Sequence, residues 1–166
     1  MTPALKNLLF LLFFFPACLF AFPSDPQQAV HITADSSTFD FKTSDNIYKG
    51  NVIITQGTTR LTADRVMTHT NKQKIVEATA YGISKPVEYS TLPKPNDAVF
   101  YAKAKKIRFY PIKSIVILEG DVIVTQGKNS FQGPILIYNI KDQTVSAPAS
   151  QTGRATMIIE SDKLKL

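Results

Sequence analysis

The sequence of 166 residues is poor in the side chains on which enzyme chemistry most often depends. It has one cysteine, two histidines and no tryptophan. The histidines, His31 and His69, do not stand at a metal-ligand spacing such as HExxH, and the chain has no GxSxG or P-loop motif. We therefore expect no catalytic residue, no metal and no cofactor.

Two aspartates are the strongest candidates for an acid pair. Asp35 and Asp64 each end a copy of the phrase x-Thr-Ala-Asp. Repetition argues against catalysis, because an acid–base pair needs two carboxyl groups with different pKa values. Aspartate after a strand is typical of a turn, where its side chain accepts backbone N–H groups. We expect both to form turns.

The single cysteine, Cys18, lies in an apolar N-terminal segment. Lys6 precedes an unbroken apolar run over residues 8–15, which is the layout of a secretory signal peptide. We expect residues 1–21 to be cleaved after Ala21 and residues 22–29, with two prolines, to be a mobile leader. The mature chain then has no thiol and tolerates an oxidising compartment. An uncleaved membrane anchor and a lipoprotein acylated at Cys18 are the alternatives.

The formal net charge is +6, which favours acidic partners. Nucleic acid, anionic lipid head groups and acidic sugars belong to this class, and export argues against nucleic acid. Lys103, Lys105, Lys106 and Arg108 form one basic cluster that could meet phosphates. A solvated strand edge, where lysine prevents aggregation, is the equal alternative for this cluster.

One phrase occurs twice. The sequence GNVIITQG at residues 50–57 returns as GDVIVTQG at residues 120–127, a shift of 70 residues. Each copy is a β-branched run with glycine at both ends, which predicts a strand between turns. The chain therefore consists of two halves built alike. The loop at residues 91–97, with two prolines, is expected to be the hinge between them.

The whole of residues 30–166 is expected to be one all-β domain. Apolar residues alternate with a period of two, and short strands follow one another about every 8 to 12 residues, as in a sandwich, barrel or roll. The expected strands include residues 30–34, 38–42, 75–81, 100–107, 130–140, 144–149 and 156–159.

Parity predicts which side chains face inward, because they alternate along a strand. The inward set is expected to line one long apolar interior, which by itself is typical of an ordinary packed core. Its members are Val52, Ile54, Val122 and Val124 of the two phrases, Leu61, Ala63, Phe131, Ile135 and Ile137 of the strands that follow them, and Phe39, Phe41, Ile107 and Phe109.

Several segments together resemble one family. Residues 30–35, the phrase at 50–57, residues 61–66 and Lys85-Pro86 are similar to the OstA-like (LptA) family, the periplasmic lipopolysaccharide-transport bridge proteins of Gram-negative bacteria. The resemblance covers about residues 30–159. It implies an all-β fold, a slightly twisted, open-ended β-jellyroll of many short antiparallel strands. It also implies a non-enzymatic lipopolysaccharide carrier in the periplasm after signal-peptide cleavage.

The resemblance further implies how such a carrier works. Lipid A acyl chains bind in an apolar groove, and copies stack head-to-tail to bridge the inner and outer membranes. An inner-membrane relay subunit and an outer-membrane translocon are the other partners. The implied lipid-binding residues are Ile32, Phe39, Phe41, Val52, Ile54, Leu61, Tyr89, Ile107, Phe109, Leu118, Val122, Val124, Phe131, Ile135 and Ile137. The implied oligomer edges are Val30, His31, Ile32, Thr33 and Ala34 at one end and Met157, Ile158 and Ile159 at the other.

Three other readings stay open on the sequence. A membrane-anchored relay subunit of the same pathway would retain residues 1–22. A periplasmic sugar-acting enzyme on a β scaffold would place a carboxylate pair in one cleft. A structural β-protein would have a dry, packed interior and no ligand.

Overall fold

The computed structural model describes residues 28–160 except 73 and 143, and within these residues it is built of antiparallel strands. The predicted signal peptide and nearly all of the predicted leader lie outside the described residues. Within them, no helix has the length and apolar character needed to cross a membrane. The strands are β1 (His31–Thr33), β2 (Ser36–Asp40), β3 (Asp45–Gln56), β4 (Thr59–Asn71), β5 (Lys74–Tyr81), β6 (Val87–Thr91), β7 (Phe100–Ala104), β8 (Lys106–Tyr110), β9 (Ile115–Gln126), β10 (Asn129–Asn139), β11 (Thr144–Ser146) and β12 (Thr156–Ile158).

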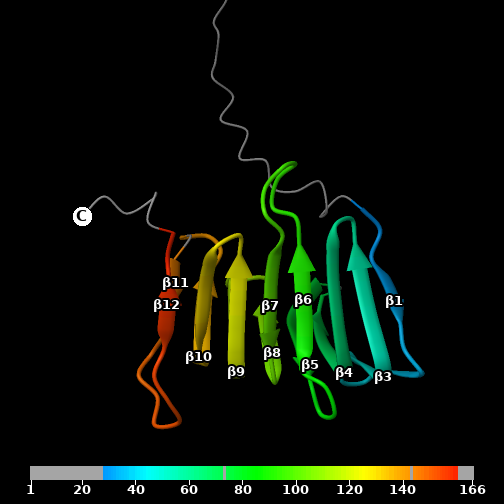
Figure 1. The fold of residues 1–166 in the computed structure, drawn as a ribbon. Helices are drawn as coiled ribbons and strands as arrows, with labels where there is room; N and C mark the ends of the chain where they lie inside the picture. Colours follow the sequence, from blue (N-terminus) through cyan, green and yellow to red (C-terminus); the bar gives the residue numbers. More distant parts are fainter. Residues whose placement is uncertain (1–27, 73, 143, 161–166) are drawn as a thin grey trace, which may run out of the picture.

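Four long strands, β3, β4, β9 and β10, create two layers because each pairs with different partners along its length. The first sheet runs in the order β1-β3-β4-β6-β7-β9-β10-β12, which Figure 1 shows from blue β1 to red β12. The second sheet runs in the order β2-β3-β4-β5-β8-β9-β10-β11. The long strands pass from one sheet into the other, so the two sheets are joined along one line and their inner faces face each other.

The fold line, which we call the spine, lies at two glycine bulges. At Gly50 and Asn51 the φ angles are 75° and 44°, and at Gly120 and Asp121 they are 78° and 48°. Two residues of β3 there oppose one residue of β4, because the register passes from Lys49 directly to Val52. An extra residue bends and twists a strand, and glycine tolerates the positive φ. The expectation that Gly50 and Gly120 end their strands is therefore wrong: each lies inside a continuous strand.

The two halves predicted from the repeat are two copies of one six-stranded unit. In the first unit β1 and β2 pair with β3, and β5 and β6 pair with β4. In the second, β7 and β8 pair with β9, and β11 and β12 pair with β10. The units join because β5 pairs with β8 and β6 with β7. The prediction of a hinge at residues 91–97 is therefore wrong, since the strands on either side of that loop pair with each other.

The inner faces of both sheets are apolar, as alternation predicts. In the first sheet one row of directly opposed residues crosses all eight strands: Ile32, Ile54, Leu61, Tyr89, Ala102, Val124, Phe131 and Met157. In the second sheet the corresponding row is Tyr48, Val66, Ala80, Ile107, Leu118 and Leu136. The tightest packing lies beside the spine, where Val52, Val87 and Val122 are 0–1% exposed.

Two of the predicted inward residues of β10 face outward. Leu136 is 5% exposed and Tyr138 packs against the core, whereas Ile135 and Ile137 have the opposite parity. The bulge of β9 places two residues opposite Pro134, so the register shifts between Gly133 and Ile135. Parity counted onward from Phe131 therefore fails at Pro134.

The prediction for Phe41 is also wrong. The strand expected over residues 38–42 is β2, which ends at Asp40, and Phe41 lies in the following turn with 94% of its surface exposed. Phe39 does lie on the inner side, where its ring meets that of Tyr48 edge-on at 6.1 Å. It is 52% exposed because β2 is an edge strand.

Candidate functional site

The apolar interior is closed along the spine. The links between β1 and β2, between β5 and β6 and between β7 and β8 all cross from sheet to sheet there. Backbone hydrogen bonds hold them, from Asp35 N to Gly50 O at 2.9 Å, from Gly82 N to Lys105 O at 2.8 Å and from Lys105 N to Gly120 O at 2.9 Å. This side of the interior is therefore a wall of paired backbone.

The side opposite the spine is different, because each sheet ends there in its own set of turns. The first sheet ends at residues 57–58, 92–99 and 127–128, and the second at 41–44, 72, 111–114 and 140–142. Bonds between neighbouring turns run within a sheet: Thr70 N donates to Ser44 O at 2.9 Å, and Ile140 N donates to Ser114 O at 2.8 Å. Opposite the spine the interior is thus bordered by two rows of turns, and we call the region between these rows the mouth.

Burial of the inner residues falls from the spine toward the mouth. Val52 and Val122 are 1% and 0% exposed, whereas Ile54 and Val124, two residues farther along the same strands, are half-buried. Phe109, on the inner face of β8 near the mouth, is 37% exposed. The inner residues are therefore tightly packed beside the spine, in the part we call the floor. Nearer the mouth, in the part we call the walls, they are partly accessible.

The predicted lipid-binding residues divide accordingly into three groups. Val52, Ile107, Leu118 and Val122 are buried in the floor, and Phe131, which opposes Val124, is buried as well; Ile32, Phe39, Ile54, Leu61, Tyr89, Phe109 and Val124 face inward and keep part of their surface exposed; Phe41, Ile135 and Ile137 do not face inward. Sequence reasoning missed Val87, Ala102, Ala104, Val116, Leu136 and Tyr138, which line the same interior. Alternation in residues 100–104 and 115–118 was the available signal for three of them, Ala102, Ala104 and Val116.

Both repeated aspartates lie at the spine and hold the chain there. Asp35 Oδ2 accepts a hydrogen bond from Asn51 Nδ2 at 3.0 Å. One oxygen of Asp64, Oδ2, accepts the backbone N–H groups of Ile83, Ser84 and Lys85 at 2.6, 2.5 and 3.1 Å. These bonds, chiefly those from Lys85 and Ser84, stabilise the carboxylate and lower the pKa of Asp64 from 3.8 to about 2. Asp64 thus fixes the turn between β5 and β6 from inside β4, so the expectation that it ends a strand and forms a turn of its own is wrong.

This lowered pKa makes an acid-labile contribution to folding. A carboxyl group that titrates at a lower pH in the folded state stabilises the protein above its unfolded pKa and loses that effect as the pH falls through the folded pKa. We expect part of the free energy of unfolding to disappear between about pH 4 and about pH 2. In Asp64→Asn that part should be absent, so urea unfolding of the variant should depend less on pH over this window. Equal slopes in the two proteins would contradict the assignment.

The basic cluster predicted at residues 103–108 is not one site. Lys105 lies at the spine, where Nζ contacts Asp121 Oδ2 at 2.7 Å. Lys106 and Arg108 lie on the outer face of β8 and both contact Glu119, at 3.6 and 2.8 Å. The interpretation of a joint phosphate site is therefore wrong, because the chain turns at Lys105, which contacts Asp121, whereas Lys106 and Arg108 share Glu119 on the outer face of β8.

The two ends of the double sheet are open edges. Among the described residues, β1 and β2 pair with β3 alone, and β11 and β12 pair with β10 alone. Large apolar residues are exposed on both edges: Val30, Ile32 and Phe39 at one, and Val145, Met157, Ile158 and Ile159 at the other. The residues predicted as oligomer edges thus do lie in or beside edge strands.

Comparison with known proteins identifies the family to which this chain belongs. A family described as LptA/(LptD N-terminal domain) LPS transport protein matches residues 31–144. The chain belongs to the LptA family. The lipopolysaccharide export system protein LptH of Pseudomonas aeruginosa is 33% identical over 136 residues, which are 82% of this chain and 74% of that protein. The LptA protein of Escherichia coli K12 is 25% identical over 146 residues, covering 88% and 78%.

A solved structure shares the LptA fold described above. The crystal structure of LptH, the periplasmic LptA homologue of the lipopolysaccharide transport device of Pseudomonas aeruginosa, superposes with a TM-score of 0.72 at 32% identity. The match covers 83% of this chain and 99% of that one. The recognition of the family and the predicted jellyroll-like, all-β fold are therefore confirmed.

Proposed function

We propose that the chain is a non-enzymatic periplasmic carrier of lipopolysaccharide. It holds the acyl chains of lipid A between its two sheets and stacks head-to-tail to bridge the inner and outer membranes. The observation that supports this most is the row of inward residues from Ile32 to Met157, which crosses the first sheet from one open edge to the other.

The geometry suits a lipid with several acyl chains. Each CH₂ group that leaves water contributes about 0.8 kcal/mol, so acyl chains need a long apolar wall rather than a few polar contacts. The half-buried inner residues Ile54, Tyr89, Phe109 and Val124 supply such a wall above a packed floor. The mouth leaves a polar head group in water while the chains are covered.

The internal repeat indicates how copies stack. Within one chain the units join through β6 and β7, where Tyr89 opposes Ala102. In the second unit Met157 takes the place of Tyr89, because it opposes Phe131 as Tyr89 opposes Leu61, 70 residues earlier. In the first unit Ile32 takes the place of Ala102, since the same shift relates them. A second copy that repeats the internal junction therefore pairs its Ile32 with Met157 of the first.

The second sheet supports the same register. Within the chain Ala78 of β5 opposes Phe109 of β8. The equivalent positions at the free edges are Val145 and Phe39, and both are 52% exposed. Stacking covers both apolar side chains and pairs the free backbone groups of the edges. Because the two edges differ, the contact is head-to-tail and repeats without closing.

The same edges suit the end partners. A relay subunit at the inner membrane and a translocon at the outer membrane need only present the complementary edge of the same fold. The bridge then begins and ends in the type of strand pairing that joins its copies, and the apolar wall continues through each junction.

Photocrosslinking in cells tests the carrier role at one pair of neighbouring positions. Ile54 faces inward opposite Leu61, and Ile53 faces outward opposite Thr62. A photoreactive amino acid at position 54 should form an adduct with lipopolysaccharide, and the same group at position 53 should not. A folded, exported protein that gives no adduct at position 54, or equal adducts at both, would overturn the proposal.

A further inference from the structure

Five lysines lie on the turns that end the second sheet. They are Lys42 in the β2–β3 turn, Lys72 and Lys74 at the β4–β5 turn, Lys113 in the β8–β9 turn and Lys141 in the β10–β11 turn. We call this set the lysine rim. All five side chains are exposed, and they come from parts of the sequence as far as 99 residues apart. The strand order alone places all five along the same side of the mouth.

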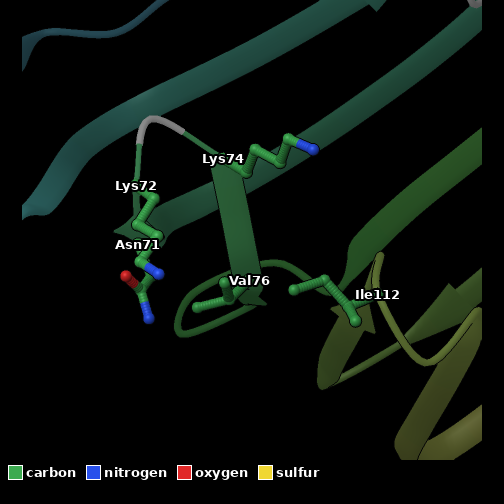
Figure 2. Close-up of a pocket in the computed structure, with 5 residues that line it drawn as sticks. All are labelled: Asn71, Lys72, Lys74, Val76 and Ile112. Atoms are coloured by element: carbon green, nitrogen blue, oxygen red, sulfur yellow. The ribbon is translucent and has the colours of Figure 1, made fainter.

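The rim is continuous along the mouth. Neighbouring strands lie about 4.8 Å apart, so successive hairpin turns of one sheet follow one another at about 10 Å. The hydrogen bonds from Thr70 N to Ser44 O and from Ile140 N to Ser114 O join the turns in pairs. Figure 2 shows the middle of the rim, where Asn71, Lys72 and Lys74 share a small hollow with Ile112 of the next turn.

The acidic residues Asp40, Asp45 and Asp142 near the rim are engaged by groups other than the rim ammonium groups. Asp40 Oδ1 accepts the N–H groups of Lys42 and Thr43 at 2.8 and 3.2 Å. Asp45 Oδ1 lies 2.8 Å from His69 Nδ1, and Asp142 Oδ2 accepts a bond from Asn139 Nδ2 at 2.6 Å. Among the described residues, the ion pairs of the protein involve His69, Lys105, Lys106, Arg108 and Lys128 but no lysine of the rim.

The turns of the first sheet, on the other side of the mouth, carry fewer lysines. The turns of the first sheet carry two lysines, Lys94 and Lys128, and one aspartate, Asp97, and Lys128 Nζ contacts Glu160 Oε1, beyond β12, at 2.7 Å. The other polar residues of these turns are Thr58 and Asn96. Lysines are therefore more numerous at the turns of the second sheet, five against two.

We infer that the lysine rim binds the phosphate groups of the head group whose acyl chains occupy the interior. This rests on the proposed function and adds to it the anionic part of the ligand. The rim borders the opening through which a head group must protrude, and ammonium groups spaced along it match phosphates on a sugar head group. Because the rim runs parallel to the stacking direction, each added copy extends it, so a head group meets lysines along the whole bridge.

The inference is tested with purified lipopolysaccharide and the same lipid after chemical dephosphorylation. Binding is measured for the wild type, for a variant with all five rim lysines changed to glutamine, and for a control with Lys49, Arg60, Lys85, Lys103 and Arg154 changed to glutamine. The control removes the same charge from positions off the rim. Circular dichroism and the unfolding midpoint show that each variant is folded.

The wild type and the control should bind intact lipopolysaccharide about tenfold more tightly than the dephosphorylated lipid, the effect of one or two lysines against anionic lipid. The rim variant should bind both lipids with the affinity that the wild type has for the dephosphorylated one. A rim variant that keeps the preference would overturn the inference and leave the carrier role intact. A wild type that binds neither lipid would overturn the carrier role itself.

One further arm separates the head group from a membrane surface. Vesicles of phosphatidylglycerol present phosphates without an acyl chain free to enter the interior. The wild type should not sediment with them at physiological salt. Sedimentation that depends on the rim lysines would show that they recognise a bilayer, and would overturn the assignment to the carried lipid.

Discussion

Changing Thr33 and Thr156 to cysteine in one chain is expected to yield a ladder of disulfide-linked oligomers under mild oxidation. If copies repeat the internal β6–β7 junction, Thr33 of one copy opposes Thr156 of the next, as Lys103 opposes Glu88 inside the chain. Opposed residues of antiparallel strands have Cα atoms about 4.5–5.5 Å apart, within the range that a disulfide spans. Both threonines are exposed in the single chain, so they are accessible for pairing.

The background for this experiment is favourable. The natural cysteine, Cys18, lies in the predicted signal peptide, so a processed chain brings no other thiol. Each copy of the double variant carries one cysteine at each edge, and the products therefore extend to trimers and beyond. Thr33→Cys alone should give no ladder, because a head-to-tail contact does not bring two copies of β1 together.

The register has its own control. His31→Cys with Thr156→Cys places both thiols on the same face but two residues out of register. Such diagonal neighbours are about 7–8 Å apart, beyond the usual reach of a disulfide. This pair should crosslink at most weakly on a non-reducing gel. Equal ladders from both pairs would show that the junction does not copy the internal one, and no ladder from either pair in a concentrated sample would contradict head-to-tail stacking.

The resemblance to the family implied these edges, while the path of the chain between them could be predicted only in part from the sequence. Alternation assigned Val52, Ile54, Val122 and Val124 to the inner face correctly, because a regular strand preserves parity. It failed for Ile135 and Ile137, because an extra residue on β9 shifts the register at Pro134. A glycine at the end of a β-branched run predicts a turn and a bulge equally well, and only pairing with a neighbour decides between them.

The lysine rim illustrates a second limit of sequence reasoning. The basic cluster at residues 103–108 was predicted because its members are close in the sequence. In the structure, however, Lys105 lies at the spine and its side chain is separated from those of its neighbours. The rim lysines are far apart in the sequence and lie along one side of the mouth because four hairpins of the second sheet turn there. The available signal was a lysine in or next to each polar turn of the second sheet, and its meaning depended on the strand order.

Phe109→Glu is expected to weaken lipopolysaccharide binding about a hundredfold while the protein stays folded. Phe109 faces the interior between Ala78 and Val116, near the mouth. Losing a large part of one aromatic contact and placing a charge beside acyl chains costs roughly 3 kcal/mol in binding. Because Phe109 is 37% exposed, the new carboxylate can still reach water, and the unfolding midpoint should fall by only a few degrees.

Two control variants distinguish the loss of the aromatic contact from the effect of the added charge. Ile83→Glu adds the same charge on the turn at the spine, at a residue that is 77% exposed, and should leave binding unchanged. Phe109→Gln removes the ring without adding charge and should lose most of the same affinity, also toward dephosphorylated lipid, because the lost contact is with acyl chains rather than phosphate. If Phe109→Gln binds normally and only the glutamate variant fails, the chains do not lie along the second sheet, and repulsion of the head group accounts for the effect instead.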